Sequence, residues 1–132
     1  LRLNFSCLLC SHILRIQFKT VATYLRDRGL GVAVVSNFDA RLSGILRGLD
    51  LLPLFDLVVT SGEVGVEKPN PVIFERVVRH YRLSGASRLL HVGDHLLKDY
   101  EAAKDFGASA ILFDPLSKRG DFYSDIQSLL PS

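Results

Sequence analysis

Two aspartates stand five positions apart in the stretch HVGDHLLKD, where an apolar run passes into an amphipathic one. A lysine, Lys68, comes before Asp94 and Asp99 in the segment EKPNP, and a serine, Ser36, comes before the lysine at the end of GVAVVS. A hydroxyl, an ammonium and two carboxylates suit a phosphate held with a divalent cation, because Mg²⁺ takes one or two carboxylates together with waters and substrate oxygens. These residue types therefore predict a site for phosphate and Mg²⁺.

The elements that must position these residues alternate along the chain from residue 19 onward. Short apolar runs bounded by Gly, Asn or Asp indicate buried strands, and the amphipathic stretches between them indicate helices. Regular alternation of this kind favours right-handed crossovers and a parallel, Rossmann-like α/β sheet. The predicted strands are 31–37, 55–61, 88–94 and 109–114, and the predicted helices are 19–28, 39–49, 72–81, 97–106 and 121–130.

The polar residues fall at the carboxyl ends of the predicted strands. Open parallel sheets bind ligands in the crevice outside those ends. Lys68 reaches the same side, because its Gly- and Pro-rich loop follows the strand that ends at Ser61. We therefore expect the polar groups to converge there. The strand-end residues are Ser36, Thr60, Ser61, Asp94 and Asp114.

Each of these residues also has a simpler structural explanation. Asp94 can cap the next helix, and Asp99 can stabilise the N-terminus of that helix. Ser36 can satisfy the turn that follows its strand, and Lys68 can be a solvated loop lysine. With Ser36 and Lys68 in this order before the aspartate pair, the functional interpretation is favoured.

Composition limits the class of protein. The chain has 132 residues, of which 48% are hydrophobic and 23% charged, which is typical of one globular domain. A net charge of +2 without basic runs argues against nucleic acid as a partner. No apolar run reaches the roughly 18 residues of a membrane span. The only cysteines, Cys7 and Cys10, are too close to staple a fold, so an intracellular location is expected.

Three segments resemble the motifs of the haloacid dehalogenase superfamily of hydrolases. VAVVSN resembles its strand ending in Ser or Thr, VEKPNPVIF resembles its Lys-Pro motif, and HVGDHLLKD resembles its Gly-Asp motif with a second aspartate. Most members are phosphatases. The resemblance implies a Rossmann-like core, Mg²⁺ as cofactor and a small phosphorylated substrate.

The same resemblance implies a role for each matching residue. Ser36 would hydrogen-bond the transferring phosphoryl group, and Asn37 would contribute its backbone N–H. Lys68 would act in catalysis with Ser36 by neutralising the charge of the phosphate. Asp94 would bind Mg²⁺, and Asp99 would support that metal site either directly or through Lys68 and water.

The chain departs from the family pattern in its first motif. The family's nucleophile is the first aspartate of a D-x-D pair at the end of the first strand, and the second aspartate is the general acid and base. No two aspartates here stand two positions apart, and residues 1–38 contain only one acidic residue, Asp27. We therefore expect the chain to be inactive as given. It would be a fragment, an altered product or a non-catalytic pseudo-hydrolase that keeps a phosphate and metal crevice.

Residues 1–18 resemble neither the D-x-D strand nor a cap domain. We expect an atypical segment over 1–18 and a hydrolase core over 19–132 that lacks its central first strand and its cap. Part of 3–16 should then lie between the strands 32–36 and 89–93, or those strands should close onto each other. The CLLC run and His12 could suggest redox chemistry or half a zinc site, but no second ligand pair follows.

Overall fold

A parallel sheet forms the centre of the fold. The computed structural model describes residues 2–5, 12–114 and 126–128. Within these ranges five strands pair in parallel in the order β3-β2-β1-β4-β5. The strands are β1 (Arg2–Phe5), β2 (Gly31–Ser36), β3 (Leu57–Thr60), β4 (Leu89–Gly93) and β5 (Ser109–Leu112).

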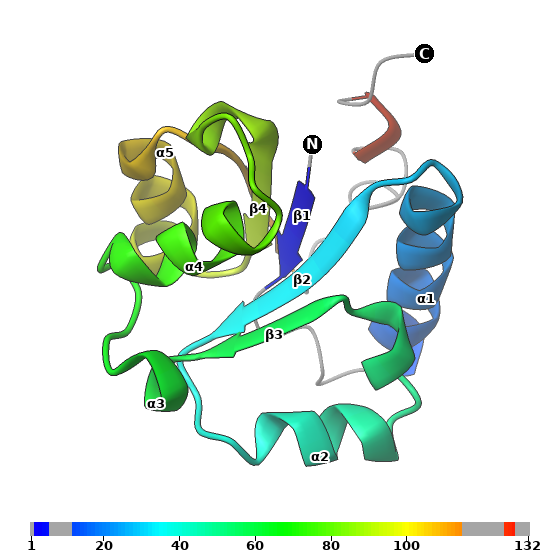
Figure 1. The fold of residues 1–132 in the computed structure, drawn as a ribbon. Coiled ribbons are helices and arrows are strands. Elements are labelled where there is room, and N and C mark those ends of the chain that lie inside the picture. The colour runs from blue at the N-terminus through cyan, green and yellow to red at the C-terminus, as the bar shows by residue number, and fades with distance from the viewer. Residues whose placement is uncertain (1, 6–11, 115–125, 129–132) are drawn as a thin grey trace.

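Helices cover both faces of this sheet. Figure 1 shows α1 and α2 on one side of the sheet and α4 and α5 on the other. The helices are α1 (His12–Asp27), α2 (Leu42–Gly48), α3 (Ser61–Val64), α4 (Val72–His80) and α5 (Ala102–Phe106), with short 3-10 turns η1 (Leu52–Leu54) and η2 (Ala86–Arg88) and a π-helical segment η3 (Leu96–Glu101).

The apolar core is divided by the sheet into two layers. Side chains alternate between the two faces of a strand, so Val34 packs in the cluster that contains Leu25 of α1, and its neighbour Val35 packs in the cluster that contains Phe74 of α4. Because both faces of β2 are buried, its sequence GVAVVS is a continuous apolar run before its terminal serine. This packing fixes the direction in which β2 presents that serine.

The four predicted strands are confirmed, each somewhat shorter than expected. The predicted start of the first helix at Lys19 was wrong, since α1 begins at His12 and runs across the boundary proposed after residue 18. The predicted helix 97–106 forms in two parts, η3 and α5. Of the predicted helix 121–130, only 126–128 are described, and they are helical.

The place of the first, central strand was expected to be filled by part of 3–16 or closed by its two neighbours, and the structure shows it filled. Arg2–Phe5 forms β1 and lies between β2 and β4, with Phe5 opposite both Val34 and Val92. Of the two arrangements considered, the sheet therefore adopts the one with an inserted segment. The sequence of this strand, RLNF, contains no aspartate.

Two further expectations from the sequence concerned the cysteines and membrane-spanning segments. Cys7 and Cys10 lie outside the described residues. No helix in the described ranges is both long enough and apolar enough to span a membrane.

Candidate active site

The carboxyl edge of the sheet presents most of the predicted polar residues. Ser36 is the last residue of β2, Thr60 is the last residue of β3, and Asp94 follows β4 directly. Ser61 begins α3 instead of ending a strand. Asp114 lies two residues beyond β5 and is exposed. The polar strand ends thus lie along the edge at which this sheet class binds ligands.

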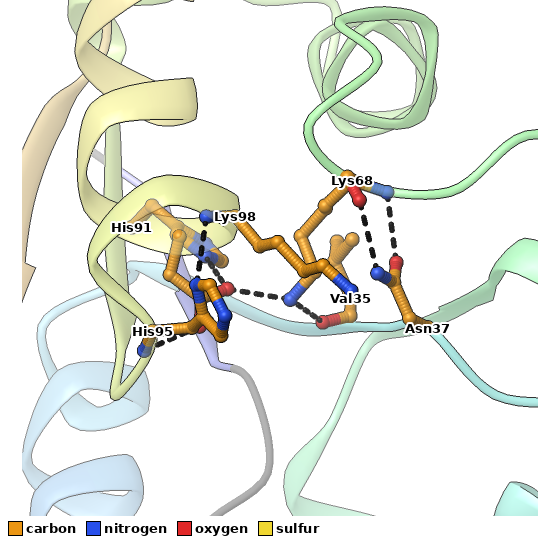
Figure 2. A network of polar contacts seen from close by, with 7 residues as sticks. Val35, Asn37, Lys68, His91, His95 and Lys98 are labelled. Carbon is orange, nitrogen blue, oxygen red and sulfur yellow. Dashed lines mark hydrogen bonds and ion pairs between the residues drawn. The ribbon is translucent and has the colours of Figure 1, made fainter.

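The loop that carries Lys68 is fastened to the end of β2 by a side chain. Asn37 accepts a hydrogen bond at its Oδ1 from the Lys68 backbone N–H, at 2.8 Å, and its Nδ2 donates to the Lys68 carbonyl, at 3.1 Å (Figure 2). The side-chain amide of Asn37 thereby satisfies both the backbone N–H and the backbone carbonyl of Lys68. Asn37 therefore sets where Lys68 enters the site.

The ammonium of Lys68 is buried and held from two sides. Its side chain is 2% exposed. Nζ donates to Asp99 Oδ1 at 2.5 Å and to the backbone carbonyl of Val35 at 3.3 Å (Figure 2). A buried charge is tolerated only when it is paired and hydrogen-bonded. The positive charge of Lys68 is consequently held at the Val35 carbonyl, near the end of β2.

Asp99 joins three parts of the chain through its carboxylate. Oδ1 accepts a hydrogen bond from Lys68 Nζ and lies 2.9 Å from Nε2 of His91 in β4. Oδ2 accepts the backbone N–H of His95, at 3.1 Å. The side chain is 1% exposed. Since η3 carries Asp99 back over the end of β4, the carboxylate is enclosed by donors from a loop, a strand and a helix start.

Charge and burial act in opposite directions on this carboxylate. Burial alone would raise the pKa of Asp99, but the hydrogen bond from His91 and the charge and hydrogen bond of Lys68 outweigh it and hold the pKa well below its usual range. For His91, burial lowers the pKa more strongly than the hydrogen bond to Asp99 raises it, and Lys68 lowers it further. The site therefore contains an ionised Asp99, a charged Lys68 and a neutral imidazole.

The structure unites some of the predicted site residues more closely than others. Lys68 and Asp99 are in contact, Asn37 is hydrogen-bonded to the Lys68 backbone, and Ser36 is half-buried at the end of β2. Asp94 is exposed. Within the described ranges, no three His, Cys, Asp or Glu side chains gather closely enough to hold a metal ion.

Two functional contacts escaped the sequence interpretation. His91 lies inside the apolar run of its strand, which is typical of a core histidine, and its side chain is 0% exposed, but its hydrogen bond to Asp99 has no signal in that pattern. The only available signal was a single polar residue inside an apolar strand. The side chain of Asn37 was likewise overlooked, since only its backbone N–H had been assigned a role. His95 caps the start of η3, where its Nδ1 accepts the Lys98 N–H.

Comparison with protein families agrees with this geometry. The family model described as haloacid dehalogenase-like hydrolase matches residues 6–107. The chain belongs to the haloacid dehalogenase-like hydrolase family. The resemblance stated from the three motifs is thereby confirmed, and so is the Rossmann-like α/β core that the family shares.

Individual relatives show how much of a full protein this chain represents. Haloacid dehalogenase-like hydrolase domain-containing protein 3 of Danio rerio is 45% identical over 86 residues, which cover 65% of this chain and 35% of that protein. Ribulose-1,5-bisphosphate 5-phosphatase of Halopiger xanaduensis is 36% identical over 92 residues, which cover 69% of this chain and 38% of that protein. The chain thus spans little more than a third of these relatives.

A solved structure gives the same picture. The crystal structure of a haloacid dehalogenase phosphatase from Thermococcus onnurineus superposes with a TM-score of 0.71 and 29% sequence identity, covering 76% of this chain and 46% of that one. This likeness agrees with the α/β fold described above.

Proposed function

We propose that this chain is the carboxyl half of a phosphoester hydrolase of the haloacid dehalogenase type, which binds the phosphate of a small substrate and, as given, does not turn it over. The observation that carries the proposal is the buried Lys68 ammonium, fixed by Asp99 and the Val35 carbonyl next to Ser36. A preorganised positive charge at the end of the strand that Ser36 terminates is suited to the oxygens of a phosphate. Two relatives, from Halopiger xanaduensis and Pyrococcus abyssi, are named as phosphatases.

In this proposal each side chain has a separate task. Lys68 neutralises the negative charge of the bound phosphate, and Ser36 donates its hydroxyl to a phosphoryl oxygen. The backbone N–H of Asn37 is a second donor, while the Asn37 side chain holds the Lys68 loop. Asp99 acts through Lys68, because both of its oxygens already accept hydrogen bonds from protein groups.

The described residues fit Mg²⁺ poorly, apart from Asp94. The Asp99 carboxylate lies 2.5 Å from the Lys68 ammonium, which already balances its negative charge, so it is a poor ligand for a metal ion. Asp94 is the exposed carboxylate at the mouth of the crevice and would hold the ion, with waters and substrate oxygens as its remaining ligands. A bound Mg²⁺ would supply additional neutralisation of the phosphate charge. With one protein carboxylate, its affinity should be low.

The absence of turnover follows from the missing D-x-D pair. Without a carboxylate nucleophile and its partner acid, the oriented charges provide only the electrostatic part of catalysis. The alternative to a fragment of an enzyme is accordingly a non-catalytic protein that binds a phosphorylated small molecule.

Titration calorimetry with inorganic phosphate, in the absence and presence of Mg²⁺, tests the binding claim. We expect measurable binding by the wild-type chain and its loss in Lys68→Met. Lys19→Met is the matched control, because it removes the same charge from an exposed position on α1. Equal binding by both variants would overturn the proposed site.

An aryl phosphate assay tests the claim of inactivity on the same samples. We expect no hydrolysis above the background with Mg²⁺ present. Hydrolysis that disappears in both Lys68→Met and Asp94→Asn would show that the chain turns over its substrate after all.

A further inference from the structure

The environment of His91 is unusually restrictive for a histidine. The ring is 0% exposed and lies in the middle of β4, with the edge of Phe74 against it at a centroid distance of 5.1 Å. Its Nε2 lies 2.9 Å from Asp99 Oδ1, whereas its Nδ1 is buried and has no hydrogen-bond partner among the residues that the structure describes. The two ring nitrogens thus have opposite surroundings.

These surroundings select one tautomer. A proton on Nδ1 would be a buried donor without an acceptor, and the Nε2 lone pair would then face a carboxylate oxygen. A proton on Nε2 instead donates to Asp99 and leaves on Nδ1 only an unused acceptor. Protonation of both nitrogens would add the unsatisfied Nδ1 donor and a second cation near Lys68. The neutral Nε2–H form is therefore the form that the site accommodates.

The position of that donor gives it a function. Lys68 and His91 donate to the same oxygen, Oδ1, from two different elements, while the His95 N–H binds Oδ2 (Figure 2). Three donors determine both the position and the plane of the carboxylate. Without His91, the carboxylate could rotate about the remaining two contacts, and Lys68 would move with it.

We propose that His91 is a positioning residue: a neutral Nε2–H donor inside β4 that holds the Asp99 carboxylate in the orientation that aims the Lys68 ammonium at the phosphate site. The inference deepens the proposed function, and it rests on that function only for its effect on phosphate affinity. The tautomer of His91 and the order of the Lys68 ammonium are properties of the unliganded chain, so they can be tested separately.

The first test is the long-range proton–nitrogen NMR spectrum of the imidazole rings of the wild-type chain, assigned with His91→Gln. The inference predicts a protonated Nε2 and an unprotonated Nδ1 for His91. A proton on Nδ1, or averaging between the two tautomers, would overturn it. The tautomer is read from the wild-type chain and needs no ligand.

The second test compares two replacements of His91. Gln carries an amide donor at a distance from the backbone similar to that of Nε2, whereas Met has a similar length and no donor. With inorganic phosphate as the probe, we expect affinity to fall about tenfold in His91→Met, the loss of one hydrogen bond to a charged group, and to recover to within about twofold in His91→Gln. The Lys68 ammonium resonance should broaden in the Met variant and sharpen in the Gln variant.

The outcomes of the second test separate the two proposals. If no sample binds phosphate but the Lys68 resonance responds to Met and recovers with Gln, the proposed function fails and the role of His91 stands. If His91→Met is folded and leaves both the Lys68 resonance and the affinity unchanged, the role of His91 is refuted. Failure of Gln to restore the resonance in a folded variant would refute it as well.

Discussion

Gly93 leaves open the space that the Asp99 side chain fills. A Cβ placed on Gly93 would stand 2.3 Å from Asp99 Cγ and 2.5 Å from Asp99 Oδ2. The glycine lies at the end of β4, and η3 brings Asp99 back over it. The Gly-Asp motif therefore does more than expose Asp94, because its glycine admits the carboxylate that holds Lys68.

Gly93→Ala should damage the site and the fold together. The methyl group would overlap the carboxylate, and overpacking of this kind costs about 1–3 kcal/mol of unfolding free energy. Denaturant unfolding measures the loss, and phosphate titration should show weaker binding. Gly44→Ala is the matched control: Gly44 is exposed on α2 with no atom within 4 Å of its added Cβ, so the change should stabilise by up to about 1 kcal/mol. Equal effects at the two glycines would contradict the steric argument.

Asn37→Ala should release the Lys68 loop from the end of β2. Two hydrogen bonds to the backbone of Lys68 would be lost, and each is worth about 0.5–1.5 kcal/mol. We expect a drop of about 1–3 kcal/mol in unfolding free energy and faster amide exchange in the loop around Lys68. Asn37→Asp should recover only the bond accepted from the Lys68 N–H, so its loss of stability should be intermediate. An alanine variant as stable as the wild type would show that the loop is held by other contacts.

Lys68 and Asp99 should be strongly coupled in a double-mutant cycle. Removing one partner of a buried pair leaves an uncompensated charge and costs about 3–5 kcal/mol. Lys68→Met and Asp99→Asn should each show a cost of that size, while the double variant should lose clearly less than the sum. Chemical denaturation of all four proteins gives the coupling energy. Additivity within about 0.5 kcal/mol would mean that the 2.5 Å contact contributes no net pairing energy.

The pH dependence of stability should carry the signature of His91. Burial holds its pKa below the usual value of about 6.5, so below that pH the unfolded chain binds more protons than the folded one. Stability should therefore be fully present above about pH 6.5 and fall as the pH decreases, by up to about 1.4 kcal/mol per pH unit. His91→Gln should flatten this slope between pH 5 and 7. The same slope in both proteins would assign it to other histidines.

The sequence predicts the site in outline because its parts are local. Ser36 follows a buried strand and Asp94 follows another, and strand direction alone brings their ends to one edge of the sheet. The shared oxygen of Asp99 could not be predicted in this way. The contact between His91 and Asp99 joins two residues eight positions apart, one in β4 and one in η3, and no local pattern specifies that pairing.

The exact residues of the central strand could not be predicted for a related reason. LRLNFSC alternates apolar and polar residues, which permits a strand, but this pattern does not specify where in the sheet the strand lies. Its structure comes from its neighbours, because β2 and β4 offer it pairing partners on both sides.

The last prediction concerns the contribution of β1 to the sheet. As a central strand it pairs with β2 and β4 through residues 2–5, so the amides of 32–36 and 89–93 should exchange slowly and cooperatively. A chain without that strand would leave both neighbours with open inner edges and would show little protection there. Asn4→Pro removes one ladder N–H and fits no central strand, at a cost of about 3 kcal/mol or more. We expect it to abolish protection in both segments. Asn4→Thr keeps the N–H and suits a strand, so protection should persist in that control. Fast exchange of 32–36 and 89–93 already in the wild-type chain would show that residues 2–5 do not complete the sheet in solution, because unpaired inner edges cannot retain slow amides.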